Sequence, residues 1–211
     1  MTLAVALVSL ASNVTTVSQL SAEANTVLAV RSTFSKVVNS GAVWAGLPIL
    51  CGWLVRRPAH GFAAGIVASL LALAVHYGVG QIFGMFDETV WAGNRFWFAL
   101  ALVPGGPLGL IGAVARTEGH SGAIARLVVP AGAIIEPFFR GMFSVPAILA
   151  WPERFSNVAA GIVLLSAGIA GAGVLIRKRG KQFAEPRASE PTSSPAPQDR
   201  RFRPSPRRIR R

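Results

Sequence analysis

The feature that most constrains the fold is a series of long apolar runs. Four runs without any Asp, Glu, Lys or Arg cover residues 38–55, 60–84, 96–115 and 157–176, and a fifth apolar region covers 121–150. A helix that crosses the hydrocarbon core of a membrane needs about 20 mostly apolar residues. Charged residues make up 14% of the chain, against about 25% in soluble domains. We therefore predict an all-α protein, a polytopic transmembrane helical bundle over residues 1–176.

The number of spans depends on the N-terminal region. Residues 3–11 are apolar, but polar side chains follow within the length of a span, so a span near 2–20 is weak. We expect six spans, with five as the alternative. A secretory signal peptide is not favoured, because no positive charge precedes the apolar stretch.

The C-terminal region has a different composition. Residues 177–211 contain 12 Lys or Arg and 3 Asp or Glu and are rich in Pro and Ser. Such a segment cannot bury enough apolar surface to fold, so we predict a disordered Pro/Arg-rich tail. Basic residues near span ends mark the cytoplasmic side. Arg177, Arg56, Arg57 and Arg116 therefore predict a plasma-membrane protein with a cytoplasmic C-terminus.

The end of the tail is strongly basic. Each Lys or Arg near an anionic membrane surface contributes about 1 kcal/mol of attraction. We expect anionic lipid headgroups to be partners of the tail, while a tail that is only solvated is an equal alternative. The arginines concerned are Arg200, Arg201, Arg203, Arg207, Arg208, Arg210 and Arg211.

The run VPGGPLG at 103–109 lies within a predicted span. Pro104 and Pro107 cannot donate a helical hydrogen bond, and Gly105 and Gly106 lie between them. An interrupted helix at this depth is typical of substrate sites in transporters. A tolerated kink that shapes helix packing is the blander interpretation, and the motif alone favours it.

Two charged residues stand inside the run VVPAGAIIEPFFRGMF at 128–143. Glu136 and Arg140 are four residues apart, so on a helix they share one face. A charge at the bilayer centre costs about 2.5–3.5 kcal/mol. A helix over 127–150 would place both there, whereas a helix over 119–139 would place Glu136 near the outer interface. The second is favoured, with 141–150 as an interfacial or re-entrant piece. The pair is either structural, which is the favoured interpretation, or a site for a polar ligand.

Few other residues suggest chemistry. His76 lies in an apolar run and is more often hydrogen-bonded across helices than bound to a metal, although it is kept as a candidate for the polar site. The sequence has no His, Cys, Asp or Glu set with metal-ligand spacing and no nucleophile or phosphate-binding motif. We therefore predict no catalytic residue, no metal and no cofactor, and we expect no enzyme and no specific nucleic-acid binding.

Three stretches carry a family resemblance. NSGAVW at 39–44, GPLGLIGA at 106–113 and the helix that closes on Glu136 and Arg140 resemble a family of small actinobacterial multi-pass membrane proteins of unknown function. The resemblance implies a plasma-membrane helical bundle and no particular activity. The size is also similar to that of the substrate-binding membrane subunits of energy-coupling vitamin importers. Those subunits usually carry an AxxxA motif in the first helix, which residues 1–20 lack.

Two functions from different classes follow from the sequence. The first is binding or transport of a small solute at a polar site formed by Glu136, Arg140 and the broken helix at 103–109. The second is a non-transporting structural or interaction protein whose basic tail recruits lipid or partners. The sequence does not indicate an oligomeric state.

Overall fold

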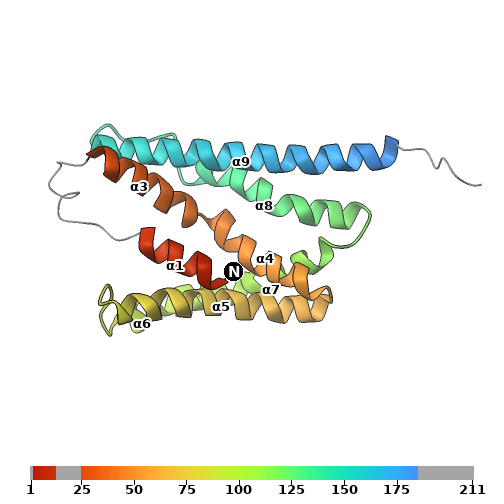
Figure 1. Ribbon diagram of the computed structural model, residues 1–211, viewed down its shortest axis with the longest axis horizontal. Helices are drawn as coiled ribbons and strands as arrows, with labels where there is room; N and C mark the ends of the chain where they lie inside the picture. The colour runs from red at the N-terminus through yellow and green to blue at the C-terminus, as the bar shows by residue number, and fades with distance from the viewer. Residues whose placement is uncertain (1, 13–24, 185–211) are drawn as a thin grey trace, which may run out of the picture.

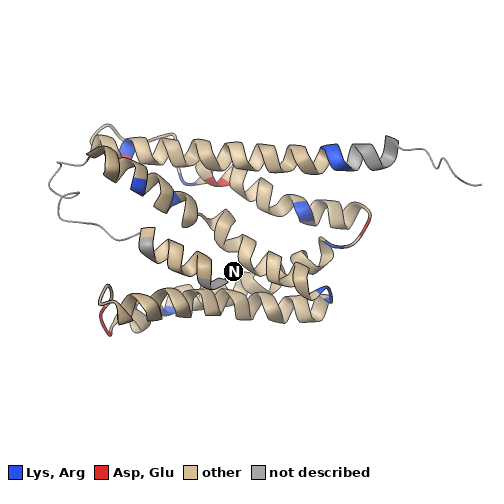
Figure 2. Cartoon of the chain, viewed as in Figure 1, with Lys and Arg blue, Asp and Glu red and all other residues tan. Residues whose placement is uncertain are grey.

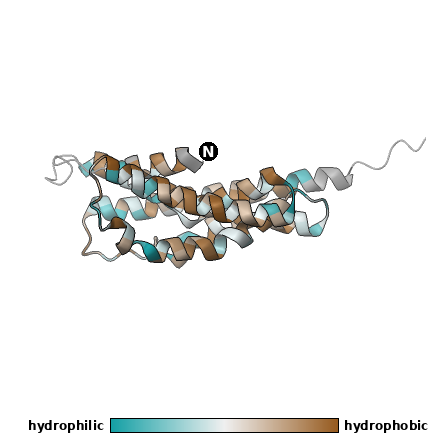
Figure 3. Ribbon diagram, turned by 90° about the horizontal axis from the view of Figure 1, so that it is seen from below, coloured by the Kyte–Doolittle hydropathy of each residue, from teal (hydrophilic) through white to brown (hydrophobic). Residues whose placement is uncertain are grey.

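The structure, a computed structural model, describes residues 2–12 and 25–184, and these residues form helices joined by turns and loops. The prediction of an all-α fold is confirmed. The helices are α1 (Thr2–Ser12), α3 (Asn25–Val38), α4 (Gly41–Val55), α5 (Pro58–Ile82), α6 (Val90–Gly93), α7 (Arg95–Val114), α8 (His120–Phe139) and α9 (Trp151–Ala184). Figure 3 shows apolar residues along the middle of the bundle and hydrophilic residues mainly towards its two ends.

Five helical segments within the described residues are long and apolar enough to cross a membrane. They are Asn25–Val55, formed by α3 and α4 together, and then Pro58–Ile82, Arg95–Val114, His120–Phe139 and Trp151–Lys178. The weak span predicted at 2–20 corresponds only to α1, whose 11 residues extend about 16 Å. Residues 13–24 lie outside the described part of the chain. Within the described residues the number of candidate spans is therefore five, the alternative number.

The first span begins earlier than residue 38, where the sequence analysis placed it. It includes Arg31 and Lys36, which precede the predicted start of the span. The Lys36 ammonium donates to Glu153 Oε1 at 2.8 Å and to Ser156 Oγ at 2.6 Å, both at the start of α9. A long side chain can reach polar partners near a span end in this way, so this lysine does not prevent α3 from being part of a span.

The C-terminal helix is also longer than predicted. We expected a disordered tail from residue 177, but α9 continues to Ala184. The predicted tail is therefore helical over its first residues. Residues 185–211, with all seven arginines proposed to bind lipid, lie outside the described residues.

The helices form two layers that α4 connects (Figure 1). α9 packs against α8 and α3 in one layer, while α5 packs against α7 in the other, with α1 against α5 and α3. α3 belongs to the first layer, whereas α4 makes most of its contacts with α7 and α5. The span Asn25–Val55 therefore passes from one layer to the other at residues 39 and 40, between its two helices.

The VPGGPLG run does not break its helix. α7 is continuous from Arg95 to Val114, so the predicted broken helix at 103–109 is wrong. Pro104 and Pro107 are exposed, while Gly105, Gly106 and Gly109 are buried. The bland interpretation, a segment that shapes helix packing, is the one the structure confirms.

Glycines bring three helices into backbone contact. A Cβ on Gly109 of α7 would lie 2.1 Å from the Gly61 carbonyl oxygen of α5, and one on Gly65 would lie 2.1 Å from the Gly105 oxygen. A Cβ on Gly52 of α4 would lie 1.8 Å from the Gly109 oxygen. Small residues that let backbones approach drive helix association in lipid, and these glycines do so between α4, α5 and α7.

The end of α8 confirms the favoured of the two helix boundaries. Gly141 has φ 62°, and its N–H donates to the Phe138 oxygen, while the Met142 N–H donates to the Pro137 oxygen. These two bonds form a Schellman motif, which ends a helix at a glycine in the left-handed conformation. Residues 141–150 then contain no helix and return to the start of α9.

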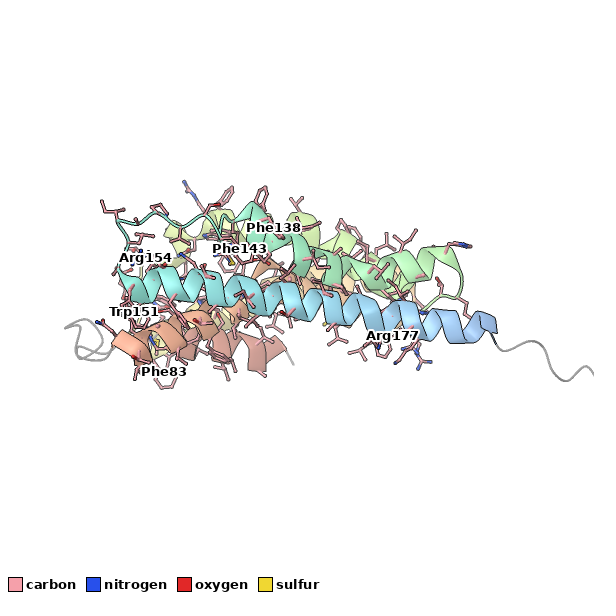
Figure 4. The ribbon with its side chains drawn as sticks, turned by 90° about the horizontal axis from the view of Figure 1, so that it is seen from above. Phe83, Phe138, Phe143, Trp151, Arg154 and Arg177 are labelled. Atoms are coloured by element: carbon pink, nitrogen blue, oxygen red, sulfur yellow. The ribbon has the colours of Figure 1, made fainter. Side chains whose placement is uncertain are left out.

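The returning segment packs against α9. Met142 is buried. A Cβ added at Gly161 of α9 would lie 2.9 Å from Phe143 Cε1 and 3.2 Å from Met142 Cβ, so both side chains contact α9 there. The rings of Phe138 and Phe143 are 5.4 Å apart (Figure 4). Residues 141–150 therefore form a non-helical segment held against α9, and their predicted place at the membrane interface stays a prediction.

Candidate functional site

The Glu136 carboxylate lies at the N-terminus of another helix. Its Oε1 accepts a hydrogen bond from the Gly41 N–H at 2.8 Å, and its Oε2 accepts one from the Ala42 N–H at 2.9 Å. The first N–H groups of a helix have no partner within that helix, and the helix dipole favours a negative charge beside them. Glu136 of α8 therefore provides the anion that α4 needs at its start.

Ser40 completes this cap. Its side chain accepts a hydrogen bond from the Val43 N–H at 3.3 Å, and its backbone is extended, as is usual for an N-cap residue. The hydroxyl is fully buried. Ser40 and Glu136 together give partners to three of the first N–H groups of α4.

Arg140 is the weaker partner of the carboxylate. Its Nη1 lies 3.2 Å from Glu136 Oε1, so the predicted contact across one helical turn is present. The Arg140 side chain is 44% exposed, whereas that of Glu136 is 12% exposed. An exposed ion pair contributes about 0–1 kcal/mol. The two backbone N–H groups are therefore the main partners of Glu136.

The carboxylate lies near the end of its own helix, as the favoured helix boundary predicts, and level with the middle of two neighbouring helical segments. Gly41, which donates to Glu136, has 16 residues before it and 14 after it in the span Asn25–Val55. On the other side of α8, Ile134 contacts Gly168, which is 17 residues from the start of the span Trp151–Lys178 and 10 from its end. Both registers place Glu136 near the middle of the neighbouring spans, although α8 itself ends only three residues later.

A second polar cluster fills the break between α3 and α4. The Ser9 hydroxyl donates to Asn39 Oδ1, and Asn39 Nδ2 donates to the Ser35 carbonyl at 3.0 Å. His76 Nδ1 lies 3.4 Å from the same Ser9 hydroxyl. The cluster joins α1, α3 and α5, and it provides partners for polar groups where the helical backbone is interrupted.

His76 belongs to this cluster and to a group of aromatic rings. The centroid of its ring is 6.2 Å from that of Trp44, 5.3 Å from that of Tyr77 and 5.9 Å from that of Phe86. Among the contacts of the described residues, none joins His76 to Glu136. The prediction that His76 is bonded across helices is supported by its contact with Ser9.

The contributions of Asn39 and His76 to the stability of the protein can be compared by mutation. We expect Asn39→Ala to lower the free energy of unfolding by about 2 kcal/mol, because it removes the bonds to α1 and leaves polar groups without partners. His76→Phe keeps the ring contacts and should cost less than about 1 kcal/mol. SDS titration of the purified protein in mixed micelles measures both. A larger loss for His76→Phe than for Asn39→Ala would assign the central role to the histidine.

The predicted polar site is not brought together. Pro104, Gly105, Gly106 and Pro107 lie on α7. The two glycines pack against α5, at Ser69 and Phe62, whereas Glu136 binds the first turn of α4. The candidate site therefore consists of Glu136, Arg140 and the start of α4, and the 103–109 segment is a packing element.

Charge is distributed unequally between the two ends of the bundle (Figure 2). One end carries six basic residues and one acidic residue, a net charge of +5. The rest of the described side chains carry five basic and four acidic residues, a net charge of +1. The basic end holds Arg56, Arg57, Arg116, Arg126, Arg177, Lys178 and Glu118. Arg177 lies at the opposite end of α9 from Trp151 and Arg154 (Figure 4).

An open apolar groove of about 320 Å³ lies at this basic end and was missed in the sequence analysis. It lies between α4 and the pair α8 and α9, where α4 has moved towards the other layer. Eight of its nine lining residues are apolar or small, and the ninth is Arg126. The lining consists of Gly46, Ile49, Leu50, Trp53, Ala115, Ala125, Arg126, Val129 and Leu175. A groove between helices far apart in sequence leaves no local pattern, so no signal in the sequence could have located it.

Comparison with protein-family models, with curated proteins and with solved structures gives no match. The resemblance to a family of small actinobacterial membrane proteins therefore stays a prediction. Within the described residues, no group of three or more His, Cys, Asp and Glu side chains could hold a metal ion.

Proposed function

We propose that this chain is a membrane-embedded, non-transporting interaction protein that binds anionic lipid headgroups at its basic end. The observation that supports the proposal is the concentration of positive charge at one end of the bundle, six basic residues against one acidic residue. The tail follows the same end of α9, and its basic residues add to this charge. Anionic headgroups are the partners that basic groups beside a membrane attract.

The contacts of Glu136 also favour this class over a solute-binding one. Both carboxylate oxygens accept hydrogen bonds from α4, so the charge at the centre of the bundle is used to join two helices. By the bias of basic residues towards the cytoplasm, the basic end faces the cytoplasm and the protein lies in the plasma membrane.

Preference for anionic lipid tests the proposal. In bilayers of phosphatidylcholine at low salt, spin-labelled phosphatidylglycerol is expected to associate with the full-length protein several-fold more strongly than spin-labelled phosphatidylcholine. The preference should fall steeply in 0.5 M salt, for which the Debye length is about 4 Å. Arg56→Gln combined with Arg57→Gln should weaken it, and deletion of 182–211 should weaken it further. Equal association of the two lipids at low salt would refute the proposal.

One observation favours a second candidate, binding of a small solute at Glu136 and Arg140. The N-terminus of α4 lies in the middle of a span and binds an anion, as half-helices do in transporters. On this hypothesis, Glu136→Gln and Arg140→Ala would leave the protein folded but abolish binding or uptake of the solute. If both variants change only stability, the pair is structural and this candidate fails.

A further inference from the structure

The groove at the basic end has the apolar lining of a lipid-chain site. Its volume of about 320 Å³ is at the lower end of the range of about 300–1,000 Å³ for ligand pockets. From Gly46 to Trp53 it follows seven residues of α4, about 10 Å at 1.5 Å per residue. That is most of one leaflet of a hydrocarbon core about 30 Å thick. The groove is open at the side, so a chain could enter from the surrounding lipid.

Two arginines lie at the end of the groove nearest the basic surface. Arg126 is part of the lining, and its Nε and Nη2 donate to the Ala115 and Thr117 carbonyls at 2.6 and 3.1 Å. These bonds fix the guanidinium through Nε and Nη2, and its Nη1 has no hydrogen bond to the other described residues. Arg126 therefore has donors available for a ligand beside the groove.

Arg116 lies over another lining residue. Its guanidinium carbon is 4.4 Å from the centroid of the Trp53 ring, and its Nη1 donates to the Trp53 carbonyl at 3.3 Å. Trp53 is 40% exposed, as is usual for a tryptophan at a membrane interface. Two guanidinium groups thus contact the groove or its wall at one end, while the lining towards Gly46 is apolar.

We infer that the groove binds one acyl chain of an anionic phospholipid from the leaflet at the basic end, with the phosphate held by Arg126 and Arg116. The charge of the two arginines complements a phosphate, which guanidinium groups bind through paired hydrogen bonds. The apolar lining complements the chain below it. The anionic class of the lipid rests on the proposed function. The inference adds to that function a defined site and a bound acyl chain.

Gly46 allows the groove to be filled without disturbing the helices. A Cβ added at Gly46 would have no atom within 4 Å, and Gly46 lines the groove. Leucine at this position is therefore expected to occupy the groove and to leave the backbone of α4 in place. Gly132 of α8 is a matched control, because a Cβ there also has no atom within 4 Å and Gly132 is not part of the lining.

Native mass spectrometry of the full-length protein, titrated with phosphatidylglycerol or phosphatidylcholine, tests the inference. The wild-type protein is expected to retain one phosphatidylglycerol molecule more tightly than phosphatidylcholine. Gly46→Leu should weaken that first binding step by about tenfold or more, which corresponds to about 1.4 kcal/mol. Gly132→Leu should leave it unchanged. If Gly46→Leu does not fold, Val129→Phe on the opposite wall serves the same purpose.

Two outcomes would overturn the inference, and they are distinguishable. If wild type and Gly46→Leu bind phosphatidylglycerol equally and more tightly than phosphatidylcholine, the groove is not the site, while the proposed function stands. If the wild type binds both lipids equally, the anionic preference is absent and the proposed function fails together with the inference.

Discussion

Gly109→Ala is expected to lower the free energy of unfolding by about 3 kcal/mol or more, at the upper end of the cost of overpacking. The added methyl group would lie 2.1 Å from the Gly61 oxygen and 2.8 Å from the Gly65 Cα. Both atoms belong to the backbone, so no side-chain rotation can relieve the contact. Helices α5 and α7 would have to separate, and their packing is among the most extensive in the bundle.

The matched control is Gly132→Ala, which adds the same methyl group where no atom lies within 4 Å. Alanine forms helix better than glycine by about 1 kcal/mol, so this variant should be as stable as the wild type or more so. SDS titration of both proteins in mixed micelles measures the difference. Equal stability of the two variants would show that α5 and α7 are not held in backbone contact at Gly109.

A consequence concerns the neighbouring glycines. Gly52 and Gly65 approach the same residue, Gly109, from α4 and α5. Because the three positions share one contact, the effects of replacing them should not add. Once Gly109→Ala has separated the helices, Gly65→Ala should cost less than it does in the wild-type protein.

The sequence was sufficient to predict the class of fold and several boundaries. The four charge-free runs fall within or over four of the five spans, the first of them only in its second half, and the apolar region 121–150 overlaps the fifth. These spans were predictable because the requirement of the hydrocarbon core is local and compositional. The end of α8 was also predictable, since Gly141 is a residue that can adopt the left-handed conformation of a Schellman motif.

The first half of the first span was missed for a physical reason. Arg31 and Lys36 interrupt its apolar character, and the partners that accommodate Lys36 lie on α9, 117 and 120 residues away in sequence. A pattern within a window cannot include such partners. The start of this span was therefore predicted at residue 38, whereas the structure places it at Asn25.

The VPGGPLG motif was ambiguous because proline indicates a missing hydrogen bond but not its position on the helix. In α7 the two prolines are exposed and the glycines face α5 and α4. The spacing of Gly105, Gly109 and Gly112 indicates a packing face, since residues three and four apart lie on one side of a helix. The motif brings helices together and does not open a polar site.

Glu136 was identified from the sequence, but its partner was not. Its main partners are the backbone N–H groups of Gly41 and Ala42, and backbone groups have no signature in sequence. One signal was present, because Ser40 directly precedes the apolar run 41–55 and serine is a preferred N-cap residue. A helix that begins inside a membrane span leaves N–H groups that need an acceptor, and an intramembrane carboxylate is a candidate for that role.

Glu136→Ala is accordingly expected to be among the most damaging single substitutions outside the glycine contacts. It removes both acceptors from the N-terminus of α4 and leaves two N–H groups without partners near the middle of the bundle. A polar group left without its partner costs about 1–3 kcal/mol, so for two N–H groups unfolding in mixed micelles should show a loss of about 2–5 kcal/mol. Glu136→Gln keeps one oxygen acceptor without the charge, so its loss should be intermediate.

Arg140→Ala provides the contrast. Because its side chain is 44% exposed and shares an oxygen that Gly41 already uses, its loss should not exceed about 1 kcal/mol. A large ratio between the two effects distinguishes a carboxylate that caps a helix from a simple ion pair. Similar losses for Glu136→Ala and Arg140→Ala would contradict this account.

The charge-swapped double variant separates the two interpretations most sharply. If Glu136 and Arg140 formed only a pair, Glu136→Arg with Arg140→Glu would restore the attraction and with it the stability. Since the carboxylate is bound by the N-terminus of α4, the swap would place a guanidinium against N–H groups and the positive end of the helix dipole. We therefore expect the double variant to be no more stable than Glu136→Ala, and rescue by the swap would show that the helix N-terminus is not the main partner.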